Sequence, residues 1–87
     1  MYSKEFTIKN AIGLHARPAT FFIQKASQFK SSIHIEKGTR SVNAKSLLGV
    51  LSLGIVCGTT VTLVAAGPDE QDAVNALGAL IESDFAE

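Results

Sequence analysis

Hydrophobic and polar residues alternate along four segments of the chain, as they do in half-buried strands. These segments are residues 2–8, 32–37, 39–43 and 60–66. The side chains expected on the buried face are Phe6, Ile8, Ile33, Ile35, Val61, Leu63 and Ala65. Gly38 offers a hairpin turn between the second and third segments, and Gly67-Pro68 ends the fourth. The alternation therefore predicts four short strands.

Two other segments carry apolar residues at helical spacing. The first has Pro18 in its first turn, where the missing N–H is no loss, and runs to about Phe29. The second follows Asp69, which we expect to cap it, and begins with acidic residues that the positive end of a helix dipole favours. The predicted buried stripes are Ala19, Phe22, Ile23, Ala26 and Phe29 in the first helix and Ala73, Val74, Leu77, Leu80 and Ile81 in the second. Gly78 should weaken the second helix slightly.

A short third helix is predicted from Ser46, a good N-cap, to Leu53, with Gly54 ending it. At about 100° per residue its apolar residues fall on two sides, Val50 and Leu53 on one and Leu47, Leu48 and Leu51 on the other. A two-turn helix on a surface cannot bury both sides, so either the three leucines face solvent or something else covers them. Exposed aliphatic clusters of this kind usually mark a docking surface. The alternative is that the segment is strand-like or fully buried.

The order of these elements is β-α-β-β-α-β-α, which predicts a two-layer α+β sandwich with helices on one face of a small sheet. The chain has 87 residues, of which 46% are hydrophobic and 18% charged. That balance is typical of one compact domain, and we expect residues 1–87 to form it.

Several classes of protein are excluded by the composition. The longest aliphatic stretch, residues 47–57, is far shorter than the roughly 20 apolar residues of a membrane span. The first ten residues lack the apolar block of a secretory signal, so we expect a cytoplasmic protein without membrane insertion. Cys57 is the only cysteine, which rules out an internal disulfide and a multi-cysteine metal site. We therefore expect neither a metal nor a cofactor.

Charge is divided unevenly along the chain. The first 45 residues hold eight bases and two acids, a net charge of +6, whereas the remainder holds six acids and no base. The basic half could steer an acidic partner, or the acidic half could simply be the solvated face of a helix. Because the whole domain is neutral and its bases form no dense cluster, direct nucleic-acid binding is not expected.

His15 is the residue whose position suggests chemistry. It lies just before Ala16-Arg17-Pro18, at the N-terminus of the first predicted helix. A helix N-terminus presents unpaired N–H groups and partial positive charge, and Arg17 adds a guanidinium suited to phosphate oxygens. An imidazole here could accept a phosphoryl group on a ring nitrogen. A histidine near a helix start can also be only a cap or a surface residue.

Four sequence blocks resemble the histidine-containing phosphocarrier (HPr) family: residues 13–20 (Gly-Leu-His-Ala-Arg-Pro-Ala-Thr), residues 42–46 (Val-Asn-Ala-Lys-Ser), Leu53-Gly54 and residues 67–70 (Gly-Pro-Asp-Glu). The resemblance covers nearly the whole chain. It implies an open-faced β-sandwich in which helices cover one face of a four-stranded antiparallel sheet. It also implies a carrier protein and not an enzyme.

The resemblance implies a relay in the phosphoenolpyruvate-dependent sugar phosphotransferase system. Phosphorylated enzyme I would pass its phosphoryl group to His15, and His15 would pass it to the IIA units of sugar permeases. In the family the group sits on Nδ1, with Arg17 as its charge partner and the N–H of Ala16 beside it. The docking face implied for these partners comprises Thr20, Phe21, Gln24, Lys25, Leu47, Leu48 and Leu51.

Ser46 is the second site that the resemblance implies. The context Lys45-Ser46 is similar to family members of low-GC Gram-positive bacteria, which are phosphorylated there by an ATP-dependent HPr kinase/phosphorylase. In those members the serine-phosphorylated form also acts as corepressor of a catabolite-control transcription regulator. The alternative is that Ser46 is an ordinary N-cap without a regulatory role.

Three other functions are compatible with parts of the sequence. A regulatory adaptor of the same fold would bind partners without carrying phosphate, although relatives of that kind lack the active histidine. The carrier of a parallel nitrogen-related phosphorelay would share the histidine block. A small hydrolase using Ser46 with His15 is disfavoured, because no well-placed acid orients the base.

Overall fold

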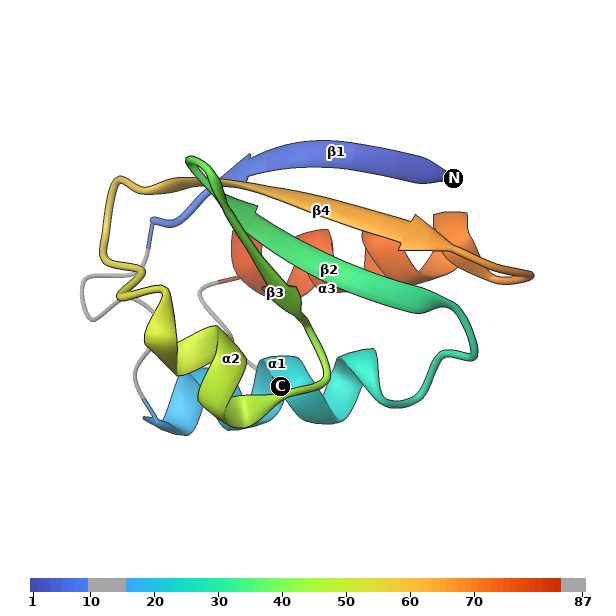
Figure 1. The fold of residues 1–87 in the computed structure, drawn as a ribbon, viewed down its shortest axis with the longest axis horizontal. Coiled ribbons are helices and arrows are strands. Elements are labelled where there is room, and N and C mark those ends of the chain that lie inside the picture. The colour runs from blue at the N-terminus through green and yellow to red at the C-terminus, as the bar shows by residue number, and fades with distance from the viewer. Residues whose placement is uncertain (10–15, 84–87) are drawn as a thin grey trace.

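The computed structural model describes residues 1–9 and 16–83, with residues 16 and 17 described by their backbone only. Within these ranges the elements are β1 (Tyr2–Thr7), α1 (Ala16–Ala26), β2 (Ser32–Lys37), β3 (Arg40–Asn43), α2 (Leu47–Ser52), β4 (Thr60–Ala66) and α3 (Glu70–Glu82). The predicted order of strands and helices is confirmed. The predicted α+β architecture is confirmed as well, since the helices lie together on one side of the sheet (Figure 1).

The sheet is antiparallel throughout, with the strand order β1-β4-β2-β3. Strands β1 and β4 pair from Tyr2↔Ala65 to Thr7↔Thr60, and β2 pairs with both β4 and β3. A two-residue turn joins β2 to β3, and Gly38 within it has a φ of 61°, which glycine adopts without a steric penalty. This register aligns the inward residues of neighbouring strands, so one face of the sheet is buried and the other is open.

The core lies between the sheet and the helices. Ile33, Ile35, Val61, Leu63 and Ala65 are buried from the sheet side as predicted, and α3 contributes all five residues of its predicted stripe. Helix α3 packs against β1 and β4, while α1 packs against both α2 and α3. Each helix therefore covers apolar surface that the strands alone would leave in water.

Helix α1 begins at Ala16, so Pro18 lies in its first turn as predicted. It ends at Ala26, before the predicted end near Phe29. Beyond Ala26 the N–H groups of Gln28 and Phe29 donate to carbonyls three residues back, which tightens the chain into a turn. Phe29 and Ile23 are consequently half-buried at the edge of the core and are not fully enclosed.

The prediction that the Asp69 side chain caps α3 is wrong. Asp69 occupies the N-cap position, but its carboxylate makes no capping hydrogen bond. Its Oδ2 accepts the N–H of Lys30 at 2.9 Å, and its Oδ1 accepts both the N–H and the hydroxyl of Ser31. The carboxylate therefore ties the start of α3 to the chain that leads into β2, because the donors there are better placed than those of its own helix.

These hydrogen bonds make the stability of the fold depend on pH. The Ser31 hydroxyl, followed by the Lys30 N–H, lowers the pKa of Asp69 from 3.8 to about 2. A depressed carboxyl pKa contributes stability that is present above 3.8 and lost as the pH falls through about 2. We therefore expect Asp69→Asn to lower the unfolding midpoint at neutral pH, and the difference from the parent to vanish near pH 2.

Thermal unfolding between pH 2 and pH 7 checks this expectation. Asp72→Asn is the matched control, because Asp72 is an exposed acid in the first turn of the same helix. Some acid dependence should persist in Asp69→Asn, since the Gly67 N–H lowers the pKa of Glu70. A constant difference between parent and Asp69→Asn at every pH would contradict the assigned role.

Candidate functional site

The first part of the candidate site is the N-terminus of α1. His15, like all of residues 10–15, lies outside the described residues, as do the side chains of Ala16 and Arg17. The backbone nevertheless places the first residue of α1 directly after His15. The first turn holds no acidic residue, so nothing in that turn offsets the partial positive charge of its N–H groups. This end of α1 is therefore electrostatically favourable for an anion.

The second part is the start of α2. Ser46 is its N-cap, with extended backbone (φ −107°, ψ 117°), and its Oγ accepts the N–H of Gly49 at 3.1 Å. The prediction of an N-cap at Ser46 is confirmed. Helix α2 ends at Ser52, and Gly54 beyond it has a φ of 60°, as expected for a residue that stops a helix. The predicted end of this helix is therefore correct to within one residue.

The leucines of α2 behave differently from one another. Leu48 is 81% exposed and Leu47 is 41% exposed, whereas Val50 and Leu53 are buried, as predicted. Leu51 is half-buried and packs against the core, so the prediction that all three leucines lie on the solvent side is wrong for Leu51. In a two-turn helix, Leu51 follows Val50 closely enough around the axis to share its packing. The alternative of a strand-like or fully buried segment is excluded.

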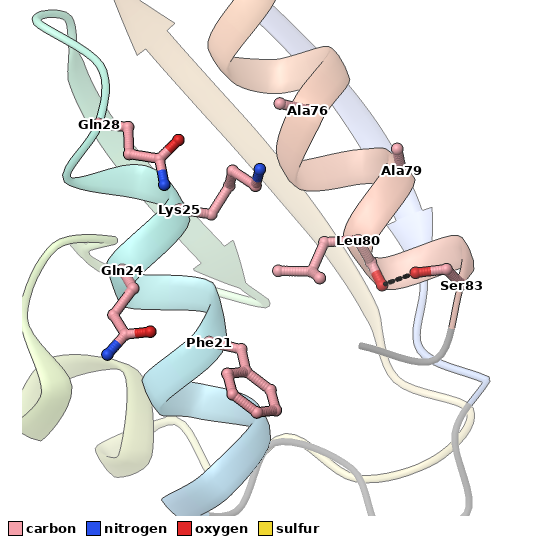
Figure 2. A pocket seen from close by; sticks show the side chains of 8 residues that line it. All are labelled: Phe21, Gln24, Lys25, Gln28, Ala76, Ala79, Leu80 and Ser83. Carbon is pink, nitrogen blue, oxygen red and sulfur yellow. Dashed lines mark hydrogen bonds between the residues drawn. The ribbon is translucent and has the colours of Figure 1, made fainter. Parts of the chain in front are cut away.

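Phe21 and Lys25 lie on the side of α1 that faces α3. They line a groove of about 470 Å³ together with residues of α3 that include Ala76 and Leu80 (Figure 2). Phe21 is half-buried against the core, so it is not a lone exposed aromatic. Its packing depends on α3, which follows some fifty residues later in the sequence, and no local pattern indicates it.

Thr20 and Gln24 complete the predicted docking residues of α1. Thr20 is half-buried and Gln24 is exposed. Gln24 also borders the groove, but in Figure 2 its side chain extends from the side of α1 away from α3. The predicted docking residues of α1 are thus divided between two sides of the helix and do not form one continuous row.

Three of the basic residues are held by backbone carbonyls at helix ends. Lys37 Nζ donates to the Leu53 carbonyl at 2.9 Å, and Arg40 Nη1 donates to the Ser52 carbonyl at 2.6 Å, both at the end of α2. Lys45 Nζ donates to the Phe29 carbonyl at 2.8 Å, just beyond α1. Cations stabilise the negative end of a helix dipole. Lys37 and Arg40 therefore stabilise the end of α2, and Lys45 holds the turn that follows α1.

Val56 is an exposed apolar residue that the sequence patterns did not single out. It is 54% exposed and lies in the loop after α2, next to the buried Ile55. The alternation of buried Leu53 and Ile55 with exposed Val56 is the signal that could have revealed it.

Residues 1–9 and 16–83 offer neither a candidate metal site nor a membrane-spanning helix. These residues contain no cluster of three or more His, Cys, Asp or Glu side chains that could hold a metal ion. Their helices are too short or too polar to cross a bilayer. Cys57 is exposed, with its Sγ 3.6 Å from the Lys9 carbonyl oxygen.

Comparison with known proteins agrees with this geometry. The family model described as the PTS HPr component phosphorylation site matches residues 2–83. The HPr-like protein Crh of Halalkalibacterium halodurans is 49% identical over 84 residues, which span 97% of this chain and all of that protein. The phosphocarrier protein HPr of Cupriavidus necator is 45% identical over 87 residues, which span all of this chain and 98% of that protein.

Solved structures give the same result. The crystal structure of an HPr from Thermoanaerobacter tengcongensis superposes with a TM-score of 0.96 at 52% identity, covering all of this chain and 98% of that one. The open-faced antiparallel sandwich implied by the resemblance is thereby confirmed. On the family model, the relatives and the fold together, the chain belongs to the HPr family, and it is a carrier protein and not a catalyst.

Proposed function

We propose that this protein carries a phosphoryl group on His15 in a phosphoenolpyruvate-dependent sugar phosphotransferase system. It takes the group from phosphorylated enzyme I and delivers it to the IIA units of sugar permeases. One observation carries the proposal: His15 immediately precedes the eleven-residue helix α1, inside the region matched by the phosphorylation-site family model.

The transfer itself requires little from the protein besides an anion-binding surface. The lone pair of His15 Nδ1 attacks phosphorus, and the electron pair of the breaking P–N bond returns to the histidine of enzyme I. The resulting dianion meets the Ala16 N–H and the Arg17 guanidinium at the start of α1. A helix N-terminus stabilises an anion by about 0.3–1 kcal/mol, which leaves the phosphoryl group transferable to the next protein.

Enzyme I and the IIA units would dock on the surface formed by α1 and α2 beside His15. The exposed side chains of Leu47 and Leu48 supply its apolar part, because such leucines gain by leaving water in a complex. Leu51, Thr20 and Gln24 would surround them, and Phe21 and Lys25 would border the surface on the α3 side.

Regulation would act through Ser46. Phosphorylation by an ATP-dependent HPr kinase/phosphorylase would add a charge of about −1.5 to −2 next to Leu47 and Leu48. That charge would weaken docking of enzyme I, since an apolar patch that must be desolvated tolerates a dianion poorly. By analogy with the family, the same phosphate would permit binding to a catabolite-control transcription regulator.

Phosphorylation at Ser46 can be measured separately from the histidine reaction. ATP and the kinase should give an acid-stable label that Ser46→Ala removes and that Ser52→Ala retains, because Ser52 is an exposed serine at the other end of α2. Ser46→Ala also loses the bond to Gly49 N–H, which costs about 1 kcal/mol, so a melting curve must show that the variant is folded. Equal labelling of Ser46→Ala and the parent would rule out this site.

The main proposal is tested by incubating the protein with phosphoenolpyruvate and enzyme I. An acid-labile, hydroxylamine-sensitive phosphoryl adduct is expected, and a IIA unit should discharge it. Absence of any adduct with a competent enzyme I would contradict the carrier function.

A second candidate is a regulatory adaptor that binds partners without carrying a phosphoryl group. The similarity to HPr-like Crh proteins, 49% and 42% identical over 97% of the chain, favours it as the alternative. Two labelling reactions, one with the kinase and one with enzyme I, distinguish the two functions. An adaptor would be labelled at Ser46 by the kinase but not by enzyme I, whereas a carrier would be labelled by enzyme I.

A further inference from the structure

A small polar pocket lies where β2 begins and β3 ends, and one of its lining residues, Lys45, directly precedes Ser46. Its volume is about 200 Å³, and its lining includes Lys30, Ser32, His34, Asn43 and Lys45. The start of β2 lies at the opposite end of the molecule from the start of α1 (Figure 1). The pocket is therefore distinct from the end of α1 that follows His15.

The groups around this pocket are predominantly hydrogen-bond donors. Lys30 is exposed, and the Lys45 ammonium uses one of its three N–H groups on the Phe29 carbonyl, a bond that fixes its position. Asn43 Oδ1 accepts the Lys45 N–H at 2.9 Å, which orients the amide so that its Nδ2 end is the remaining donor. The Ser32 hydroxyl and the His34 imidazole each add a further N–H or O–H.

Several nearby acceptors are already engaged. Besides Asn43 Oδ1 and the Phe29 carbonyl, the Asp69 carboxylate accepts the N–H groups of Lys30 and Ser31 and the Ser31 hydroxyl. Its negative charge lies on the Ser31 side of the pocket and opposes an incoming anion, but two lysines outweigh one carboxylate. Donors in excess, with positive charge, are what a phosphate group requires.

We propose that this pocket binds the phosphate group of a small phosphate monoester. Lys30 and Lys45 supply the charge, and Asn43, with the Ser32 and His34 side chains, supplies neutral hydrogen bonds. The volume corresponds to about six or seven water molecules, which leaves room for a short carbon chain beyond the phosphate group. The proposal is independent of His15 and of phosphoryl transfer.

The test is a titration followed by amide chemical shifts, with inorganic phosphate and glycerol 3-phosphate as separate probes. Saturable shifts are expected at Lys30, His34, Asn43 and Lys45. Lys30→Gln should weaken binding about tenfold, the loss typical of one charge-assisted hydrogen bond. Lys30→Gln is chosen because the exposed Lys30 side chain can change without disturbing the Lys45 bond to Phe29.

Lys4→Gln is the matched control, since it removes the same charge from β1, at the far edge of the sheet. It should bind both probes as the parent does. Sodium chloride at the same ionic strength should not reproduce the shifts.

The proposal is overturned if the shifts fail to saturate, if chloride reproduces them, or if Lys30→Gln and Lys4→Gln weaken binding equally. Tighter binding of glycerol 3-phosphate than of inorganic phosphate would identify the monoester as the preferred ligand, and the reverse order would contradict that part.

Discussion

Replacing His15 with alanine should reduce acid-labile phosphoryl incorporation from enzyme I to background. The acceptor must be an imidazole nitrogen with a free lone pair, and alanine offers none. His34, which remains in the variant, cannot substitute for it. It is exposed on the outer side of β2, whereas α1 and α2 lie across the opposite face of the sheet (Figure 1). An enzyme I docked on those helices would not reach it.

Labelling with phosphoenolpyruvate and enzyme I measures this effect. The His15→Ala protein should keep the unfolding midpoint of the parent, which shows that lost labelling is not lost folding. It should also still accept phosphate from ATP and the kinase at Ser46. A His15→Ala protein that enzyme I labels as rapidly as the parent would show that the site has been wrongly assigned.

Replacing Gly78 with alanine should lower stability, although alanine is the better helix former. The Phe6 ring of β1 lies over Gly78, and a Cβ there would overlap the ring at Cζ and Cε1. Such overpacking costs about 1–3 kcal/mol, while the gain in helix propensity is about 1 kcal/mol. We expect a net loss of up to about 2 kcal/mol, and therefore an unfolding midpoint lower by up to roughly 15 °C.

A double-mutant cycle isolates this contact. In a Phe6→Ala background the ring is absent, so Gly78→Ala should stabilise the protein and not destabilise it. Asn75→Ala, at an exposed position of the same helix, is the control for propensity alone and should be neutral or slightly stabilising. If Gly78→Ala raised the midpoint in both backgrounds, the close approach of Phe6 and Gly78 would be disproved.

The predictions from local pattern succeeded where a feature depends on neighbours in the sequence. Period-two alternation located the strands, and the cap at Ser46 and the glycine at position 54 located α2. The buried stripe of α3 was also predicted in full, because helical spacing alone decides which residues of a helix share a face.

The failures arose where a partner distant in the sequence decides the outcome. The Asp69 carboxylate turns to Ser31, 38 residues earlier, and Phe21 packs beside α3. Gly78 was expected only to weaken its helix, yet it makes room for a ring from β1. Propensity describes a residue in isolation from such contacts, and therefore could not reveal any of the three.

Parts of the candidate site could be predicted from the sequence, and other parts could not. The position of His15 before a helix and the capping role of Ser46 follow from short motifs, and the helix start is observed at Ala16. The division of the leucines was less predictable. Leu51 differs from Leu48 because the core beneath α2 extends to one and not to the other. No sequence pattern specifies how far a core extends.

The central claim is that the imidazole of His15 accepts and returns the phosphoryl group. Phosphorus and nitrogen NMR of the protein, uniformly labelled with ¹⁵N and charged by enzyme I, tests it directly. We predict a single phosphoramidate signal coupled to Nδ1 of His15, which disappears when a IIA unit is added. A phosphoryl group found on His34, on a serine, or on no residue at all would contradict the proposed function.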